Sequence, residues 1–373
     1  MYPALAVAGA IAAAEQPWTM SYIGGVGGME ERIIRKESSL PFRAVPAAAF
    51  RGRNPLGLML AFVTLLRGIL AVWSLIGRER PAAILGTGGY VCVPIFLAAR
   101  IRGVPTMIYL PDVVPGLAVK FLARIADLAA VNVEDALPHL GLFTGHRRAL
   151  VTGYPVRAAL FNQDRATSRR AFNLDDNLPV LLVYGGSRGA RSVNQAIKAL
   201  LPHLLAEMQI VHVCGREGDV VWLRKAAAAL PAELSARYRL FEYLETLDNK
   251  PGSGTMVQAF GAADLAVCRS GASTLAELPA AGLPAVLVPY PYVHQDENAD
   301  YLVRRSAAVK VADAAMLGND QPQAGALFQQ VHHLIHNRDE RQQMAERSRS
   351  LARPDAAMRL AEALYGLAVR SGG

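Results

Sequence analysis

Short runs of aliphatic and β-branched residues alternate with longer stretches of helical character along this chain. In the first half these runs are TMSYIGG (19–25), AAILGTGG (82–89), TMIYLPD (106–112), DLAAVNVE (127–134) and ALVTGYP (149–155). The pattern restarts with PVLLVYGG (179–186), IVHVCG (210–215), YRLFEYL (238–244), DLAVCRSG (264–271) and PAVLVPYP (284–291). Each run ends in glycine, proline or polar residues, so we predict strands of parallel sheets joined by crossover helices.

The restart of the pattern predicts two doubly wound α/β domains. The turn residues Gly153, Tyr154 and Pro155 interrupt the alternation and mark the boundary. We therefore expect one domain over residues 1–153 and a second over 154–353. Residues 354–373 form a predicted C-terminal helix that packs back on the first domain.

The first residues, MYPALAVAGAIAAAEQPW, have an apolar core without a preceding lysine or arginine, unlike a signal peptide. The apolar run over 4–14 is too short to cross a hydrocarbon core of about 30 Å. Pro3 suits the first turn of a helix. We therefore predict a helix that begins at residue 2 or 3.

A second apolar segment, LGLMLAFVTLLRGILAVWSLIG (56–77), interrupts the alternation. Three interpretations are open: a buried domain helix, a helix that lies on a membrane with Trp73 and the leucines inserted, and a transmembrane span. The central Arg67 disfavours the span because a charge is costly in the bilayer. The segment is flanked by Arg51, Arg53, Arg78 and Arg80.

Composition supports a folded, reduced protein with anionic partners. With 373 residues, 52% apolar and 19% charged, the chain can bury two cores. Three cysteines in apolar runs, Cys92, Cys214 and Cys268, suit buried thiols in the cytoplasm. The net charge of +8 suits a phosphate-rich ligand, a nucleic acid or an anionic membrane without choosing among them.

A glycine-rich turn, YGGSRGAR (184–191), follows one predicted strand and precedes a predicted helix over 190–205. Gly186 allows close backbone approach, Ser187 offers a hydroxyl, and the helix N-terminus binds anions, so the turn suits a diphosphate. A tight turn without ligand is the alternative. A dinucleotide fingerprint fits poorly, because its acid would be Glu207, past a long helix and not at a strand end.

The stretch CRSGASTLAEL (268–278) also follows a predicted strand. It places Glu277 one turn into a helix that starts near Ser273, where a carboxylate can accept two ribose hydroxyls. A simple helix cap with a solvated glutamate is the alternative. The polar loop PYPYVHQDENA (289–299) follows the next strand at the same sheet edge, which favours a ligand site because open α/β sheets bind ligands there.

Five segments together resemble the MurG family of peptidoglycan glycosyltransferases. They are GTGGYVCVP (86–94), TGYPVR (152–157), GGSRGARSVN (185–194), CRSGASTLAEL (268–278) and HQDENA (294–299). The resemblance covers nearly the whole chain in order. It implies a GT-B architecture of two facing Rossmann-like domains, and inverting transfer of N-acetylglucosamine from UDP-N-acetylglucosamine to undecaprenyl-linked N-acetylmuramyl-pentapeptide.

Carried over by position, the resemblance implies a donor site in the second domain. Arg157 and Ser187 lie on the diphosphate side with Gly186, Leu244 lies beside the uracil, and Gln295 reaches the sugar hydroxyls. Glu277 holds the ribose. The residues that wrap the sugar and ribose are Ala272, Ser273, Thr274, Leu275, Ala276 and Glu277. An ordinary ion pair for Arg157 and core packing for Leu244 remain alternatives.

The resemblance also implies the partners and the location. The acceptor is lipid-linked, no nucleic acid takes part, and the enzyme binds the cytoplasmic face of the inner membrane peripherally through residues 56–77. No cofactor is expected. The family is metal-independent, and the chain has no Asp-x-Asp motif, in agreement with metal independence.

Two departures from the family pattern stand out. Where the family has His-Glu-Gln-Asn, this chain has Tyr109, Leu110, Pro111 and Asp112, so Asp112 is a candidate base or an altered acceptor contact. The family also begins with a strand and a GGTGGH loop before the segment that corresponds to residues 2–8. We expect that strand, and the histidine considered the general base, to lie upstream of Met1.

Other functions remain open on sequence alone. A catalytically impaired relative would keep Ser187 and Glu277 and bind the UDP-sugar without transferring it. A UDP-sugar epimerase of the same fold would not need the apolar segment over 56–77. A GT-B transferase that acts on another lipid acceptor is the nearest alternative, which the fold alone does not exclude.

Overall fold

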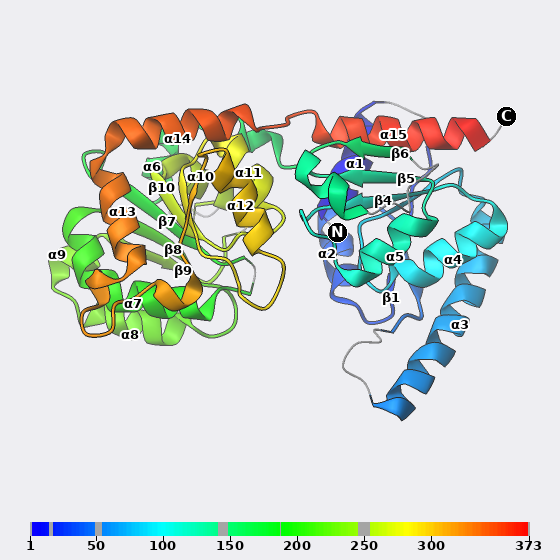
Figure 1. The fold of residues 1–373 in the computed structure, drawn as a ribbon, viewed down its shortest axis with the longest axis horizontal. Helices are drawn as coiled ribbons and strands as arrows, with labels where there is room; N and C mark the ends of the chain where they lie inside the picture. The colour runs from blue at the N-terminus through cyan, green and yellow to red at the C-terminus, as the bar shows by residue number, and fades with distance from the viewer. Residues whose placement is uncertain are drawn as a thin grey trace. The chain divides into compact units, whose positions relative to one another are not determined.

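The computed structural model describes residues 2–14, 18–48, 54–140, 148–186, 188–244 and 254–371. The chain divides into two compact units (Figure 1). Unit 1 comprises Met1–Pro155 with Asp355–Gly373, and unit 2 comprises Val156–Pro354. Ser187 lies outside the described residues.

Unit 1 alternates helices and strands. Its strands are β1 (Tyr22–Gly25), β2 (Phe42–Val45), β3 (Ile84–Gly86), β4 (Thr106–Leu110), β5 (Leu128–Val131) and β6 (Arg148–Val151). Its helices are α1 (Tyr2–Ala13), α2 (Met29–Glu37), α3 (Pro55–Glu79), α4 (Cys92–Arg102), α5 (Leu117–Ile125), the 3-10 helix η1 (Glu134–Leu140) and α15 (Ala356–Ser371).

The described strands of unit 1 form two parallel sheets. β1 pairs with β2 in one, and the other has the order β3-β4-β5-β6. Along β4, Met107 and Tyr109 pack in a cluster with α1 and α15, whereas Ile108 and Leu110 pack in a cluster with α3, α4 and α5. Successive side chains of a strand point to opposite faces. The four-stranded sheet is therefore covered on both faces.

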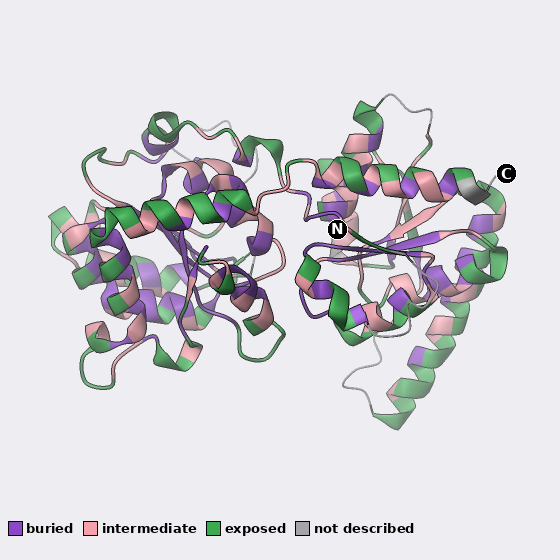
Figure 2. Cartoon of the chain, turned by 45° about the horizontal axis from the view of Figure 1, so that its top comes forward, coloured by how far each residue is buried: buried purple, intermediate pink, exposed green. Residues whose placement is uncertain are grey.

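Helix α3 changes character along its length. Asn54 caps its N-terminus by accepting a hydrogen bond from the Gly57 amide (2.8 Å). Towards the C-terminus, Val72 and Ile76 are buried in the unit 1 core. Nearer the N-terminus the helix is exposed, and Figure 2 shows that this end projects from the unit. Its exposed apolar side chains are Leu56, Leu58, Met59, Leu60, Phe62, Val63, Leu66, Leu70 and Trp73.

Unit 2 repeats the alternation. Its strands are β7 (Val180–Tyr184), β8 (Gln209–Val213), β9 (Tyr238–Phe241), β10 (Leu265–Cys268), β11 (Ala285–Leu287) and β12 (Val309–Lys310). Its helices are η3 (Ala158–Leu160), α6 (Arg165–Ala171), α7 (Arg191–Glu207), α8 (Val220–Ala228), α9 (Ala232–Ser235), α10 (Met256–Ala262), α11 (Thr274–Ala281), α12 (Asp296–Arg304), η4 (Asp313–Ala315), η5 (Pro322–Ala324), α13 (Ala326–His336) and α14 (Arg338–Ser350).

The unit 2 strands form one parallel sheet with the order β12-β11-β10-β7-β8-β9. Residues of α7, α13 and α14 pack with Leu181 and Val183 of β7 in its main core cluster. Asp264 joins β7 and β10 at their start: its carboxylate accepts hydrogen bonds from the Val180 amide (2.9 Å) and from buried Arg169 (2.9 Å). The hydrogen bond from Val180 links the starts of the two central strands, and the ion pair with Arg169 links them to α6.

The observed strands confirm every strand predicted from the hydrophobic runs. Strands β2 and β12 were not predicted, because each is short and carries a polar residue, Arg43 or Lys310, in a sequence without a long apolar run. The helix expected to begin at residue 2 or 3 is confirmed as α1, and the helix expected over 190–205 is confirmed as α7. Helix α15 packs on α1 through Leu360 and Leu364, which share a core cluster with Val7 and Ile11.

Candidate functional site

The strand order of unit 2 reverses between β7 and β10. The chain proceeds from β7 to β8 and β9 on one side, and β10, β11 and β12 lie on the other. Helices α7 and α11 follow β7 and β10, so both begin near this point. A ligand of an open α/β sheet binds outside the carboxyl ends of the strands at such a switch point. The two glycine-containing turns that precede these helices are therefore the candidate site.

The turn after β7 requires glycine. Gly186 and Gly189 have φ values of +83° and +86°, a backbone conformation that residues with a Cβ rarely adopt. A Cβ on Gly189 would lie 2.0 Å from the Cys214 carbonyl oxygen. Ala190, the N-cap of α7, supplies no side-chain acceptor, so the amides of the first turn are available for an anion.

A network of buried polar groups holds this turn. The side-chain amide of Asn194 in α7 donates hydrogen bonds to the Cys214 carbonyl and to the Asp219 carboxylate (both 2.8 Å), and its Oδ1 contacts His212 Nε2 (2.9 Å). The second ring nitrogen of His212 contacts the Tyr238 hydroxyl (2.7 Å). Burial lowers the pKa of His212 to about 3, so the ring stays neutral. Sequence reasoning missed this support.

The turn after β10 leads into α11, where the structure places the residues predicted to wrap a sugar. Thr274 and Leu275 are buried, while Ala272, Ser273 and Ala276 are partly exposed. Ser273 is the N-cap and its carbonyl accepts the Glu277 amide (2.8 Å). The Thr274 hydroxyl bonds back to the Arg269 carbonyl (3.1 Å). The predicted helix start near 273 is confirmed.

Glu277 lies one turn into α11 and is partly buried. Burial raises its pKa above the usual carboxyl range, while a hydrogen bond from the Ser273 side chain and the positive charge of Arg157 act in the opposite direction. Arg157, exposed at the N-cap of η3, therefore belongs to the electrostatic surroundings of Glu277. The structure brings these two predicted residues together.

Gln295 orders the loop after β11. Its side-chain oxygen accepts a hydrogen bond from the Tyr290 amide (2.9 Å), and its carbonyl accepts the Ser270 hydroxyl (2.7 Å). Asn298 also bonds to the Ser270 carbonyl (3.0 Å). The loop after β11 is thereby tied to the turn after β10, and its amide side chain stands at the same sheet edge.

Arg269 is a second residue that sequence reasoning missed. Its guanidinium, almost fully buried, contacts the Asp313 carboxylate (2.6 Å), the Ser192 hydroxyl (2.6 Å) and the Val288 carbonyl (3.0 Å). It connects the N-terminal turn of α7 with the ends of β10 and β11. The position of Arg269 directly after a strand could have marked it as a candidate site residue. Its partners Ser192 and Asp313 could not be predicted, because they come from segments far away in the sequence.

Two further predicted residues follow other strands, β9 and β4. Leu244 is buried and follows β9. The two residues before it, Glu242 and Tyr243, line a surface cavity of about 470 Å³ together with Arg216. Asp112 belongs to unit 1, where it is partly buried after the carboxyl end of β4. The preceding Pro111 carbonyl accepts a hydrogen bond from Asn132 (3.0 Å).

The chain matches two family models. Residues 1–131 match the glycosyltransferase family 28 N-terminal domain, and residues 180–360 match the C-terminal domain of that family. Among curated relatives, the UDP-N-acetylglucosamine–N-acetylmuramyl-(pentapeptide) pyrophosphoryl-undecaprenol N-acetylglucosamine transferase of Roseiflexus sp. is 54% identical, with 99% of this chain and 93% of the relative covered. The enzyme of that name from Desulforudis audaxviator is 36% identical, with 99% and 96% covered.

Comparison with solved structures supports the same family and fold. MurG of Acinetobacter baumannii is similar with a TM-score of 0.72 and 26% identity, covering 98% of this chain and 95% of that one. A UDP-GlcNAc 2-epimerase from Neisseria meningitidis reaches 0.64 at 13% identity, with 98% and 97% covered, which shows the shared fold alone. The chain is a glycosyltransferase with the two-domain GT-B fold and belongs to the MurG group of glycosyltransferase family 28.

Proposed function

We propose that this chain transfers N-acetylglucosamine from UDP-N-acetylglucosamine to the C4 hydroxyl of undecaprenyl-diphosphate-linked N-acetylmuramyl-pentapeptide, the step that makes lipid II from lipid I. The observation that carries the proposal is the 54% identity, over almost the whole chain, to a relative whose name states this donor sugar and acceptor. The N-terminus of α7, which has no side-chain cap and so suits a diphosphate, also supports the proposal.

The donor occupies the two turns of unit 2 in this proposal. Its diphosphate lies against the first-turn amides of α7, with Gly186, Ser187 and Arg157 on the same side. Glu277 accepts hydrogen bonds from both ribose hydroxyls, and Gln295 reaches the sugar hydroxyls. The backbone and side chains of residues 272–276 surround the sugar and ribose, and Leu244 lies beside the uracil.

In the transfer step, the acceptor oxygen forms a bond to C1 of the sugar while the bond from C1 to the UDP oxygen breaks. The hydroxyl proton passes to a base, for which we propose Asp112, and UDP leaves with the electron pair. The α7 and α11 N-termini and Arg157 stabilise the negative charge on UDP, so no metal is required. A positioned base contributes roughly 10²- to 10⁴-fold.

The acceptor requires a membrane surface, and α3 is suited to it. It is the helix, in the described part of the chain, that is long and apolar enough to cross a membrane, which by itself is weak evidence of membrane association. Val72 and Ile76 are packed in the unit 1 core, so the helix is not free to span. We propose that its exposed apolar face, which runs from Leu56 to Trp73, inserts into the cytoplasmic leaflet, with arginines on anionic head groups.

The proposal is tested by incubating the purified protein with UDP-N-acetylglucosamine and a lipid I analogue in anionic vesicles, and detecting the disaccharide product by mass spectrometry. We expect transfer without added metal and in the presence of a chelator. Binding of the donor without transfer would favour the impaired relative, and transfer only to a different lipid acceptor would reject the proposed substrate.

A further inference from the structure

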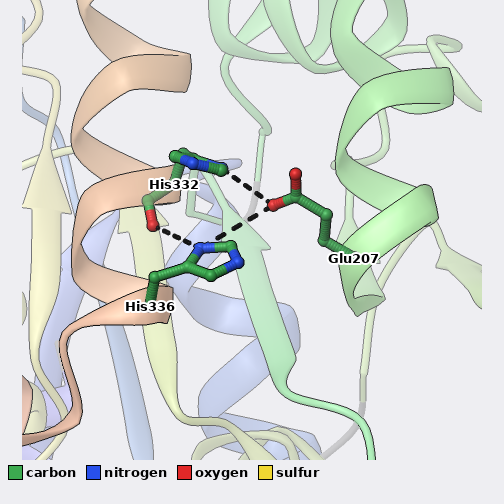
Figure 3. A group of neighbouring side chains, drawn as sticks. All are labelled: Glu207, His332 and His336. Carbon is green, nitrogen blue, oxygen red and sulfur yellow. Dashed lines mark hydrogen bonds and ion pairs between the residues drawn. The ribbon is translucent and has the colours of Figure 1, made fainter.

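Three side chains of unit 2 that the proposed transfer does not use meet between α7 and α13. They are Glu207, the last residue of α7, and His332 and His336, one turn apart on α13 (Figure 3). The Glu207 Oε2 lies 2.9 Å from His332 Nδ1 and 3.9 Å from His336 Nδ1. One ligand atom from each residue lies within 4.8 Å of the others.

These residues are a suitable ligand set for a transition-metal ion. Two imidazoles and one carboxylate are ligands of Zn²⁺, with bonds of about 2.0–2.2 Å. Ligand atoms at tetrahedral angles on such bonds lie about 3.3 Å apart. Glu207 Oε2 and His332 Nδ1 are 2.9 Å apart, and one ligand atom from each of the three residues lies within 4.8 Å of the others, so side-chain rotations would bring the three to this spacing. The half-exposed imidazoles leave room for these rotations and for entry of the ion.

Neighbouring groups orient both imidazoles. His336 Nδ1 lies 2.9 Å from the His332 carbonyl, and a proton donated there leaves Nε2 with the lone pair that a metal needs. The His332 ring stacks on Phe328, with centroids 5.6 Å apart and an interplanar angle of 20°. In metal sites, a hydrogen bond from the second ring nitrogen sets the tautomer and the orientation of a ligand histidine. The stacking on Phe328 restricts the orientation of the His332 ring.

The cluster is separate from the candidate donor site. Helix α7 begins at the carboxyl edge of the sheet with Arg191 and ends with Glu207, about 25 Å away for 17 helical residues. The next residues lead into the amino end of β8. A metal at Glu207 would therefore lie at the opposite edge of the sheet from the diphosphate turn.

We propose that Glu207, His332 and His336 bind a divalent ion of the zinc class, with water in the fourth position. The ion joins the C-terminal end of α7 to α13, two helices that share the main core of unit 2. Because the site lies away from the reacting groups, its role is to stabilise unit 2, and the transfer itself stays independent of metal.

The test uses the full-length protein without an affinity tag, stripped with a chelator and titrated with Co²⁺, whose visible absorption reports a site of low coordination number. Zn²⁺ is then added in competition. We expect one Co²⁺ per chain, displaced by Zn²⁺, and a higher unfolding temperature with Zn²⁺. The substitutions H332A, H336A and E207Q are each expected to weaken binding by more than about 100-fold, since even loss of outer-shell partners costs 10- to 100-fold.

His333 provides a matched control on the same helix. It pairs with Glu340 (2.6 Å) and is outside the cluster, so H333A should bind Co²⁺ as the unmodified protein does. Absence of the Co²⁺ band in the unmodified protein, or equal affinity in H332A, H336A and E207Q, would overturn the proposal. Donor affinity measured with UDP should be the same with and without Zn²⁺, and a large change would contradict a separate stabilising site.

Discussion

The two units arrange similar strands differently. In unit 2, β7 lies inside one continuous six-stranded sheet and pairs with both β8 and β10. In unit 1, the described strands are divided between a two-stranded and a four-stranded sheet, in which β1 pairs with β2 and β3 with β4. Among the described strands, those before the glycine turns of unit 1 each pair with one neighbour, whereas β7, before the main turn of unit 2, pairs with two.

This difference bears on how rigidly each unit can hold a ligand. The turn after β7 is held by Asn194, His212 and Asp219 beneath it, and the turn after β10 by buried Arg269. In unit 1, the turn after β1 is held by the pairing of β1 with β2 and by Glu30, whose carboxylate accepts a hydrogen bond from the Gly25 amide (2.9 Å). Among the described residues, the turns of unit 2 are therefore held by more buried side-chain contacts than the turn after β1.

The largest expected effects come from one substitution in each unit, and they change different kinetic constants. Asp112→Asn in unit 1 removes the proposed base and should lower kcat by about 10²- to 10⁴-fold with little change in donor KM. Glu277→Gln in unit 2 removes a charged acceptor of ribose hydroxyls and should raise donor KM by about 10- to 100-fold. Steady-state kinetics with UDP-N-acetylglucosamine as the varied substrate distinguish them.

Each substitution also has a result that contradicts its role. If Asp112→Asn keeps full kcat, the base lies elsewhere and Asp112 is only an acceptor contact. If Glu277→Gln leaves UDP affinity unchanged in calorimetry, the glutamate does not bind the ribose. Circular dichroism of both variants serves to exclude unfolding as the cause of any loss.

A second prediction compares two glycines that have the same φ, +86°. In unit 2, Gly189→Ala places a Cβ 2.0 Å from the Cys214 carbonyl oxygen and should destabilise the unit by more than about 3 kcal/mol. In unit 1, a Cβ on Gly89 meets no atom within 4 Å, so Gly89→Ala should cost only about 1–2 kcal/mol, from the positive φ. Hydrogen exchange of peptides from each unit measures the loss of stability in each variant. Equal losses in Gly189→Ala and Gly89→Ala would contradict the prediction that the clash with Cys214 adds to the cost.

The sequence was sufficient to predict strands where apolar runs are long and bounded by turn residues. Strands β7, β8 and β10 are buried throughout, and their runs are unambiguous. Strands β2 and β12 are short, and what makes them strands is pairing with a neighbour, a non-local condition that no short window of sequence contains. The division of the unit 1 strands into two sheets likewise depends on pairing.

The candidate site was predictable only where chemistry is local. The glycines at 186 and 189 and the position of Glu277 in a first helical turn follow from spacing. Arg269 bonds to Ser192 and Asp313, residues 77 and 44 positions away, so its role depended on the fold. The character of α3, half core and half exposed, also depends on which residues meet α4.

A third prediction concerns the stability of unit 2 in acid, which depends on its buried His212. The pKa of His212 is about 3 in the fold and 6.5 when unperturbed, so between these pH values the unfolded chain binds a proton that the folded chain does not. Unit 2 should therefore lose about 1.4 kcal/mol of stability per pH unit as the pH falls below 6.5. His212→Gln should remove this slope. Hydrogen exchange corrected for its intrinsic pH dependence measures it, and an unchanged slope in the variant would contradict the assignment.

The smallest expected effect divides α3 itself. Leu70 is 66% exposed and Val72 is fully buried two residues later. Leu70→Ala should change the free energy of unfolding by less than about 0.5 kcal/mol, whereas Val72→Ala should cost about 2 kcal/mol through the cavity it leaves. If the exposed face inserts into the membrane, Leu70→Ala should instead weaken binding to anionic vesicles, by up to about tenfold for one lost leucine contact. Co-sedimentation with vesicles measures the binding of both variants. If Leu70→Ala binds as the unmodified protein does and Val72→Ala binds more weakly, membrane affinity depends on the folding of unit 1 and not on the exposed face of α3.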